Sequence, residues 1–392
     1  MKSYNSKYEK ISTLSTFILI PLSGLVTDIY IPSFPEMQSV FNTSAGGIQI
    51  TLTCFLISYG VTMFFAGSLV DSFGRYRIVL SALLLFALSN LLIAYVPNLY
   101  LIYLIRVLQG VLTALIVVGK RAFLVDIYSG EKLKHYMSLL SIIWALGPIT
   151  APFLGGYLQA YWGWRSNFIF LGGYALVSFL IEVFFSGEAM RSKQPFQASI
   201  IFSNYRKILG TPEFSLGLLI LGASYAMVLV FAMTAPFIIE GQFRFSSIVT
   251  GYCALISGLG IFSGGILAKR LIGKPLLAKL NIANIAECTI ALLMFFVGIF
   301  VTDIYVLMLF VFAMHVCSGF IYNVYFTFCL TRFPEIAGIS SGITSGGAYL
   351  VTSVLSYGTV HLVSVNNQSS LAICYFLMAA LIFSLVQVLR RT

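Results

Sequence analysis

Charged residues are scarce in this sequence. They make up 9% of the 392 residues, whereas hydrophobic residues make up 59%, and the mean hydropathy is +0.95. Soluble domains carry roughly 25% charged residues, and a globule in water could not cover this much apolar surface. The scarcity of charge therefore excludes a soluble protein and indicates an integral membrane protein.

Patterns of metal-binding and nucleophilic residues are also missing. The chain has only three histidines and no HExxH pattern, and its six cysteines show no CxxC spacing. There is no nucleotide-binding loop and no soluble sensor domain. These absences disfavour a membrane enzyme or a receptor, and we expect no metal, no cofactor and no disulfide framework. The cysteines all lie in apolar stretches and are expected to be small packing residues: Cys54, Cys253, Cys288, Cys317, Cys329 and Cys374.

Long polar segments are equally rare, because apolar runs fill most of the chain. A membrane-spanning helix needs about 20 mostly apolar residues, and twelve such runs can be traced. They lie near 11–34, 46–69, 77–96, 99–121, 135–160, 165–186, 213–239, 246–268, 277–300, 303–330, 338–362 and 369–389. The sequence thus predicts an all-α integral membrane protein of twelve transmembrane helices. A signal peptide is the alternative for the first run, but no small-residue cleavage site follows it.

The lysines and arginines indicate which side of the membrane each loop faces. Twelve spans place both termini on one side. If that side is the cytoplasm, all but three of the 23 lysines and arginines lie in inner loops or tails. The exceptions are Arg165 and Arg244 on the outside and Arg106 within a helix. This bias predicts cytoplasmic termini, and it explains the net charge of +10 without a nucleic-acid partner.

Two similar turns suggest a duplicated unit. GSLVDSFGR (67–75) follows the second run, and GGILAKRLIGK (264–274) follows the eighth, about 198 residues later. Each places glycine at a helix end before a basic turn, although Lys269 stands where Asp71 would be. We expect two related six-helix bundles, as in many secondary transporters. Their predicted bounds are 1–186 and 213–392, joined by a cytoplasmic linker at 187–212.

The turn GSLVDSFGRYR (67–77) resembles the cytoplasmic-loop signature of the major facilitator superfamily. Gly67 permits close helix contact, Gly74 permits a tight turn, and Asp71 can accept from arginine or cap the next helix. The resemblance implies a latch between the two halves of the outward-facing protein, formed by Gly67, Asp71, Gly74, Arg75 and Arg77. The alternative is a basic loop that serves topology only.

The fourth run contains LIRVLQGVLTAL (104–115), which resembles a second motif of this superfamily. Arg106, Gln109 and Gly110 are in place, but Leu112 stands where a second glycine is usual. An arginine in lipid is costly and normally faces a cavity or a partner. Snorkelling of Arg106 to the outer interface is the alternative.

The fifth run contains WALGPITAPFLGGYL (144–158), which is similar to the superfamily's antiporter motif. Pro148 and Pro152 each remove an intrahelical hydrogen bond, and Gly147, Gly155 and Gly156 allow close packing. We expect a pliable helix that bends as a cavity changes sides. Within the superfamily this motif is associated with exporters. An ordinary kinked packing helix is the alternative.

Several further stretches resemble the Bcr/CflA subgroup of twelve-span drug:proton antiporters. They are DIYIPSFP, RAFLVDIY (121–128) and GWRSNF (163–168), together with the motifs above and Gln49–Leu52. The resemblance covers the whole chain, but its specific motifs lie in the first half. It implies a multi-pass carrier of the bacterial inner membrane that uses the proton gradient and no cofactor. Its partners would be protons, a small-molecule substrate and the lipid bilayer, and we expect a monomer.

Asp28, in GLVTDIYIPSFP (24–35), is an unexplained charge in an apolar run. It lies about six residues, roughly 9 Å, below the outer end of the first span, and Arg106 lies roughly 12 Å below that of the fourth. Burial disfavours the charged form of a carboxylate, and a nearby arginine favours it. We predict that Asp28 carries the coupling proton and that Arg106 tunes it. The alternative is that Asp28 only holds Arg106 in place.

The other acids within the spans are expected to have different roles. Glu287 is expected to hydrogen-bond Asn284 or to extend toward the inner face, and Glu182 is expected to lie at the interface. Asp126 is expected to form an inner gate network with Arg121. Two single histidines in apolar spans are expected to be packing residues: His315 and His361.

Polar and aromatic residues within the spans are the candidates for substrate contact. They are Tyr30, Gln49, Tyr59, Gln109 and Trp144 in the first half and Tyr225, Met227, Tyr322, Asn323 and Tyr325 in the second. Aromatic residues make up 15% of the chain, so abundance alone can explain any one of them.

These observations predict a proton-coupled exporter of small amphipathic molecules such as drugs. A dedicated exporter of one metabolite, such as a siderophore, is an alternative that the sequence does not separate. Proton-coupled uptake of a nutrient is a further alternative, and the glycine–proline pattern of 144–158 disfavours it.

Overall fold

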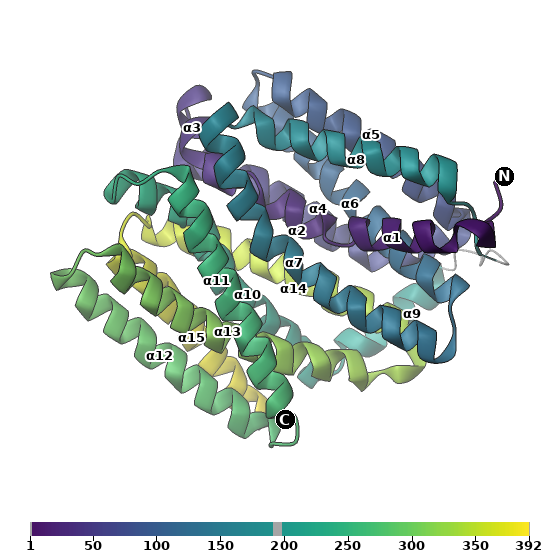
Figure 1. Ribbon diagram of the computed structural model, residues 1–392. Helices are drawn as coiled ribbons and strands as arrows, with labels where there is room; N and C mark the ends of the chain where they lie inside the picture. The colour runs from purple at the N-terminus through teal and green to yellow at the C-terminus, as the bar shows by residue number, and fades with distance from the viewer. Residues whose placement is uncertain (1, 191–197, 392) are drawn as a thin grey trace.

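The computed structural model describes residues 2–190 and 198–391, which are built almost entirely of helices (Figure 1). The helices are α1 (Glu9–Leu19), α2 (Leu22–Asp28), α3 (Phe34–Val40), α4 (Ala45–Phe73), α5 (Arg75–Tyr95), α6 (Leu99–Ile127), α7 (Gly130–Trp162), α8 (Arg165–Phe185), α9 (Ala198–Leu209), α10 (Pro212–Pro236), α11 (Ser247–Arg270), α12 (Leu276–Phe300), α13 (Ile304–Arg332), α14 (Ala337–Val363) and α15 (Gln368–Leu389). Short 3₁₀ turns form η1 (Ser6–Tyr8), η2 (Ile31–Ser33) and η4 (Pro334–Ile336), and η3 (Phe237–Gln242) extends α10 as a π-helix. Part of the predicted linker, with the predicted inner cations Arg191 and Lys193, lies outside the described residues.

Eleven segments of the described chain are helical, long and apolar enough to cross a membrane. They match eleven of the twelve predicted runs, which confirms an all-helical membrane protein. The remaining run, 338–362, forms the 27-residue helix α14, which is not among the eleven. Glycine, serine and threonine are frequent in α14 and lower its hydropathy. The count of twelve spans and the side on which the termini lie stay predictions.

The first span differs from its prediction in continuity and length. It runs from η1 to Val40 rather than ending near 34. Prolines interrupt it, because a proline has no N–H to donate within a helix: Pro21 separates α1 from α2, and Pro32 lies in η2. Asp28 is therefore the last residue of α2, and it lies further from the end of the span than the sequence predicted.

The hydrophobic core has two large parts. One is formed by helices α1 to α8 together with Leu229 and Met233 of α10. The other is formed by α9 to α15. In Figure 1 the helices of the first group, purple to teal, lie in the upper part of the view, and most of those of the second group, teal to yellow, lie below them.

The two groups of helices pack on each other where α7 meets α11 and where α4 meets α14. We call the end of the molecule that holds α3 the outer end, and the end that holds the N-terminus and α9 the inner end (Figure 1). Helix α7 approaches α11 at Ile149, Pro152 and Gly156, all in the outer half of α7. Lys132 and Lys134, in the first turns of α7, are exposed. In this structure the outer halves of α7 and α11 are thus packed together.

Candidate functional site

Four tyrosines from both groups of helices meet near the middle of the molecule, and we call them the tyrosine cluster. The ring of Tyr349 lies edge-on to Tyr59 at 5.0 Å and to Tyr225 at 6.2 Å between centroids. Tyr225 also contacts Tyr322 at 5.6 Å. The four residues come from α4, α10, α13 and α14. Three of them were predicted as substrate contacts, and Tyr349 was missed because α14 carries no motif that the sequence analysis used.

Asp28 faces this cluster from the end of α2. It is 7% exposed, and it acts electrostatically on Tyr225 and Tyr349. Its carboxylate makes no hydrogen bond and no ion pair with any residue that the structure describes. A buried carboxylate is normally hydrogen-bonded or paired, so in this conformation the Asp28 carboxyl group lacks the partner that would stabilise its charged form.

Arg106 does not pair with Asp28, which corrects the predicted geometry. The side chain of Arg106 is wholly buried, so snorkelling is excluded as well. Its guanidinium donates to Gln109 Oε1 (2.9 Å), Val26 O (3.2 Å) and Thr51 O (3.3 Å), and it lies 4.6 Å from the ring centroids of Tyr30 and Phe55. These contacts join α6 to α2 and α4, so Arg106 holds the helix that carries Asp28 rather than the carboxylate itself.

The other predicted substrate contacts lie mainly in helix packing, away from the tyrosine cluster. Tyr30 and Gln109 both contact the Arg106 guanidinium. In the first half, Gln49 Nε2 donates to Met233 O (3.0 Å) and Trp144 Nε1 donates to Ser23 Oγ (3.2 Å). In the second half, Asn323 Nδ2 donates to Gly319 O (2.8 Å) and the Tyr325 hydroxyl donates to Glu213 O (3.4 Å). Met227 Sδ accepts from Ser318 Oγ (3.1 Å). Gln49 thus bridges the two groups of helices near the outer end. Trp144 lies near the cluster, because its partner Ser23 also neighbours the Tyr59 hydroxyl.

Arg121 and Asp126, the predicted gate network, do not pair with each other in this conformation. Asp126 Oδ2 pairs with Arg75 Nη1 at 2.5 Å. Arg121 instead acts electrostatically on Tyr59 and Tyr349, and its buried Nε has no hydrogen-bond partner among the described residues. Two ionisable side chains therefore lie beside the tyrosine cluster, the acidic Asp28 and the cationic Arg121. Neither forms an ion pair with a described residue.

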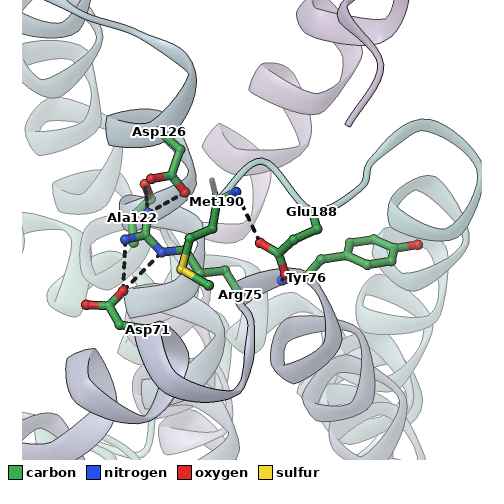
Figure 2. Close-up of polar contacts among 7 residues, drawn as sticks. All are labelled: Asp71, Arg75, Tyr76, Ala122, Asp126, Glu188 and Met190. Carbon is green, nitrogen blue, oxygen red and sulfur yellow. Dashed lines mark hydrogen bonds and ion pairs between the residues drawn. The ribbon is translucent and has the colours of Figure 1, made fainter. Parts of the chain in front are cut away.

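The turn at 67–77 is built around Arg75 (Figure 2). Besides Asp126, the Arg75 guanidinium binds Asp71 Oδ1 at 2.8 Å and the carbonyl oxygen of Ala122 at 2.6 Å. Gly74 ends α4 with φ of +103°, a backbone conformation that side chains other than glycine rarely adopt. The tight turn and the Asp71–arginine contact are thus present. They tie α4 and α5 to the inner end of α6.

Two members of the predicted latch make no such contact. A Cβ atom added to Gly67 would meet open space, so its predicted close helix contact does not occur in this conformation. Arg77 is exposed. The turn is held from another direction by Glu188, whose carboxylate accepts from the backbone N–H of Tyr76 (3.2 Å) and of Met190 (3.3 Å) (Figure 2). Glu188 was not predicted as part of the turn, because it lies in the segment 187–212 that was expected to be a linker.

Arg75→Gln is expected to destabilise the inner end by about 2 kcal/mol, because it removes charge-assisted hydrogen bonds from two carboxylates. Arg77→Gln is the matched control, since Arg77 is exposed on the same helix. Thermal unfolding of the purified protein in detergent measures both. Equal unfolding temperatures for the two variants would contradict the role of Arg75.

Helix α7 packs closely on one partner helix on each side. A Cβ added to Gly147 would lie 2.7 Å from Pro21 O, and one added to Gly155 would lie 1.6 Å from Ile29 O, beside α2. A Cβ added to Gly156 would lie 2.5 Å from Ser247 O of α11. Pro148 and Pro152 both lie inside α7, and Pro148 packs on Gly24 of α2. The predicted close packing is therefore present, and it joins α2 to α11 through α7.

Gly156→Val is expected to separate α7 from α11 and to open the outer end, because a larger side chain in a packed contact costs about 1–3 kcal/mol. Gln49→Cys, in a variant that lacks the native cysteines, provides a single thiol whose accessibility measures how far the outer end has opened. Its labelling by a membrane-impermeant maleimide is expected to rise about tenfold. Gly173→Val is the control, since a Cβ at Gly173 meets open space. Equal labelling in both variants would contradict the gate.

Glu182 lies near the inner end of α8, as predicted, but it is buried in an ion pair that the sequence did not predict. Its Oε1 pairs with Lys120 Nζ at 2.7 Å and accepts from Ser15 Oγ at 2.6 Å, and both charged side chains are 2% exposed. This buried ion pair joins α6 to α8. The sequence could not show it, because the two residues lie on helices far apart in the chain.

The second group of helices has buried polar networks of its own. Glu287 accepts from Asn284 Nδ2 (3.2 Å), as predicted, and from Ser318 Oγ (3.0 Å). The other network joins His315 to Ser257 (2.8 Å) and Tyr375 (3.2 Å). Unlike Asp28, these groups have hydrogen-bond partners. His361 is exposed and lies over Gly46 of α4. Within the described residues, no three side chains of the metal-binding types gather.

Known proteins resemble this chain in sequence and in fold. The sequence profile of the Major Facilitator Superfamily matches residues 16–357. The chain is 26% identical over 259 residues to multidrug resistance protein D of Escherichia coli (strain K12), a match that covers 66% of this chain and 65% of that protein. It is 28% identical over 244 residues to the bicyclomycin resistance protein homolog of Haemophilus influenzae, covering 62% and 59%.

A solved structure shares the fold. It is the partially occluded inward-open conformation of the xylose transporter XylE from E. coli, with a TM-score of 0.74, 13% identity and 98% of each chain covered. At this identity the likeness shows the fold alone. The curated relatives named above are matched over about three fifths of their length.

Proposed function

Because the chain belongs to the Major Facilitator Superfamily, we propose that it is a proton-coupled transporter that exports small amphipathic molecules, including drugs, by antiport. The relatives named for multidrug and bicyclomycin resistance support an export role. The proton gradient is the energy source, and no cofactor takes part. The protein acts as a monomer in the bacterial inner membrane.

The observation that carries this proposal is the unpaired carboxylate of Asp28 beside the tyrosine cluster. A carboxylate without a partner in a low-dielectric site binds either a proton or a cationic group of a substrate, but not both. The proton and the substrate therefore compete for the same carboxylate. Because only one of them is bound at a time, they move across the membrane in opposite directions. Arg106 contributes by fixing α2, and the tyrosines supply aromatic faces for the apolar or cationic part of a substrate.

Alternating access requires two bodies that rock about this site. The proposed bodies are residues 1–186 and 213–392, each with six transmembrane helices, joined by the cytoplasmic linker 187–212. Both termini lie in the cytoplasm, so the outer end faces the periplasm. Packing of α7 on α11 in their outer halves supports an inward-open state here. The open space at Gly67 is consistent with this state, because the latch is proposed to form in the outward-open one.

Export is tested in everted membrane vesicles from cells that express the chain. An acidic interior is expected to drive ethidium into wild-type vesicles, and an uncoupler is expected to release it. Vesicles without the chain are the control. A panel of dyes, antibiotics and siderophores then separates broad export from export of one metabolite. Accumulation of no compound in response to the gradient would contradict the proposal, and movement in the opposite direction would indicate uptake.

A further inference from the structure

The four basic residues on or beside α6 differ in how their charges are satisfied. Lys120 pairs with Glu182, Arg75 binds two carboxylates, and Arg106 has three oxygen acceptors and two aromatic rings. Arg121 has no hydrogen bond or ion pair with any described residue, although its Nε is buried. The side chain as a whole is half-buried, but a nitrogen shielded from water without an acceptor is costly, so packing alone does not explain Arg121.

Arg121 acts electrostatically on the tyrosine cluster. Its electrostatic partners are the hydroxyl-bearing rings of Tyr59 and Tyr349. Tyr349 is also a partner of Asp28. Tyr59 comes from the first group of helices and Tyr349 from the second, so Arg121 faces the contact between them. The unpaired Arg121 guanidinium and the unpaired Asp28 carboxyl group thus both act electrostatically on the tyrosine cluster.

We propose that Arg121 binds an acidic group of the substrate, so that the preferred substrates are zwitterions. An amine would bind at Asp28, a flat apolar body would lie against the tyrosine cluster, and a carboxylate would bind the Arg121 guanidinium. A guanidinium presents two parallel N–H donors to a carboxylate, which gives both strength and direction. The inference rests on the proposed function, since it names the class of molecule that the same site carries.

A gate role for Arg121 is the competing explanation. In that case the side chain would pair with an acid only after the two halves rock. The nearest acid on its own helix, Asp126, is held by Arg75, and Asp71 is held by the same arginine. A gate residue affects transport of every substrate equally, whereas a binding residue changes the preference between an acid and its ester. The two explanations therefore predict different measurements.

Binding of three forms of one fluorescent molecule tests the proposal on the purified full-length chain in detergent. Norfloxacin is a zwitterion near neutral pH, its methyl ester keeps only the amine, and its N-acetyl derivative keeps only the acid. Wild-type protein is expected to bind norfloxacin roughly tenfold to a hundredfold more tightly than the methyl ester, as a charge-assisted contact provides. In Arg121→Gln the ratio of the affinity for norfloxacin to the affinity for its methyl ester is expected to fall to about one. Arg121→Lys is expected to restore part of this ratio.

Two controls separate binding from folding and from coupling. Arg270→Gln, which changes an exposed arginine at the end of α11, is expected to keep the wild-type ratio. Asp28→Asn is expected to remove the advantage of norfloxacin over the N-acetyl derivative while preserving the advantage over the ester. An unchanged acid-to-ester ratio in Arg121→Gln, or equal wild-type affinity for acid and ester, would overturn the proposal. The ratio needs no proton gradient, so failure of coupled export in vesicles is a separate outcome.

Discussion

Asp28→Asn is expected to reduce proton-driven ethidium transport in proteoliposomes to the level seen with an uncoupler. Asparagine has nearly the shape of aspartate but cannot take up or release a proton in this pH range. The carboxylate has no partner among the described residues, so the change breaks no hydrogen bond, and the protein is expected to fold. Downhill exchange of ethidium without a gradient is expected to continue, because the helices that rock are unchanged.

Glu287→Gln is the matched control, because Glu287 is the other fully buried acid without an ion-pair partner in the described chain. Its carboxylate is already hydrogen-bonded. Glutamine can accept from Asn284 through its oxygen and donate to the Ser318 hydroxyl through its nitrogen. We expect this variant to keep gradient-driven transport. Full coupling in Asp28→Asn would exclude Asp28 as the proton carrier, and loss of coupling in Glu287→Gln alone would move that role to the second half.

Glu182→Ala is expected to lower the free energy of unfolding by about 3–5 kcal/mol, because it leaves the Lys120 ammonium buried without a counter-charge. Both side chains are 2% exposed, so water cannot replace the lost partner. The double variant Lys120→Met/Glu182→Leu is expected to recover most of the loss, since apolar residues of similar volume need no pairing. Denaturant-induced unfolding in detergent measures the three proteins.

The exposed pair of Glu131 and Lys134 provides a control on α7. Its side chains are 89% and 75% exposed, and exposed ion pairs contribute little to stability. Glu131→Ala is expected to unfold like the wild type. If Glu182→Ala also unfolds like the wild type, the ion pair between α6 and α8 does not hold the first half together.

The helices could be predicted from the sequence because hydropathy and length determine them locally. The turn at Gly74 could be predicted for the same reason, since Asp71 and Arg75 stand four residues apart at a helix end and meet there. Arg121 and Asp126 are five residues apart, which places them roughly 140° apart around the helix. That spacing alone argues against their pairing, and helix geometry could have corrected the prediction.

Contacts between distant helices could not be predicted in this way. Arg106 binds two backbone carbonyl oxygen atoms, at Val26 and Thr51, and every residue has such an atom, so no side-chain pattern marks them. Tyr349 lies in a helix whose small residues pack on α4, for example Gly346 near Gly60. A glycine-rich stretch signals close packing, but it does not name the partner. The site therefore depends on tertiary contacts that one sequence does not show.

Proton release on substrate binding tests the central claim most directly, since the claim is that proton and substrate compete for Asp28. Ethidium is added to purified protein in a weakly buffered detergent solution, and a pH-sensitive dye reports the change. The wild type is expected to release protons as ethidium binds, and Asp28→Asn is expected to bind ethidium more weakly, through the tyrosine cluster, with no release. Equal release from both proteins, or ethidium binding to the wild type without any release, would contradict it.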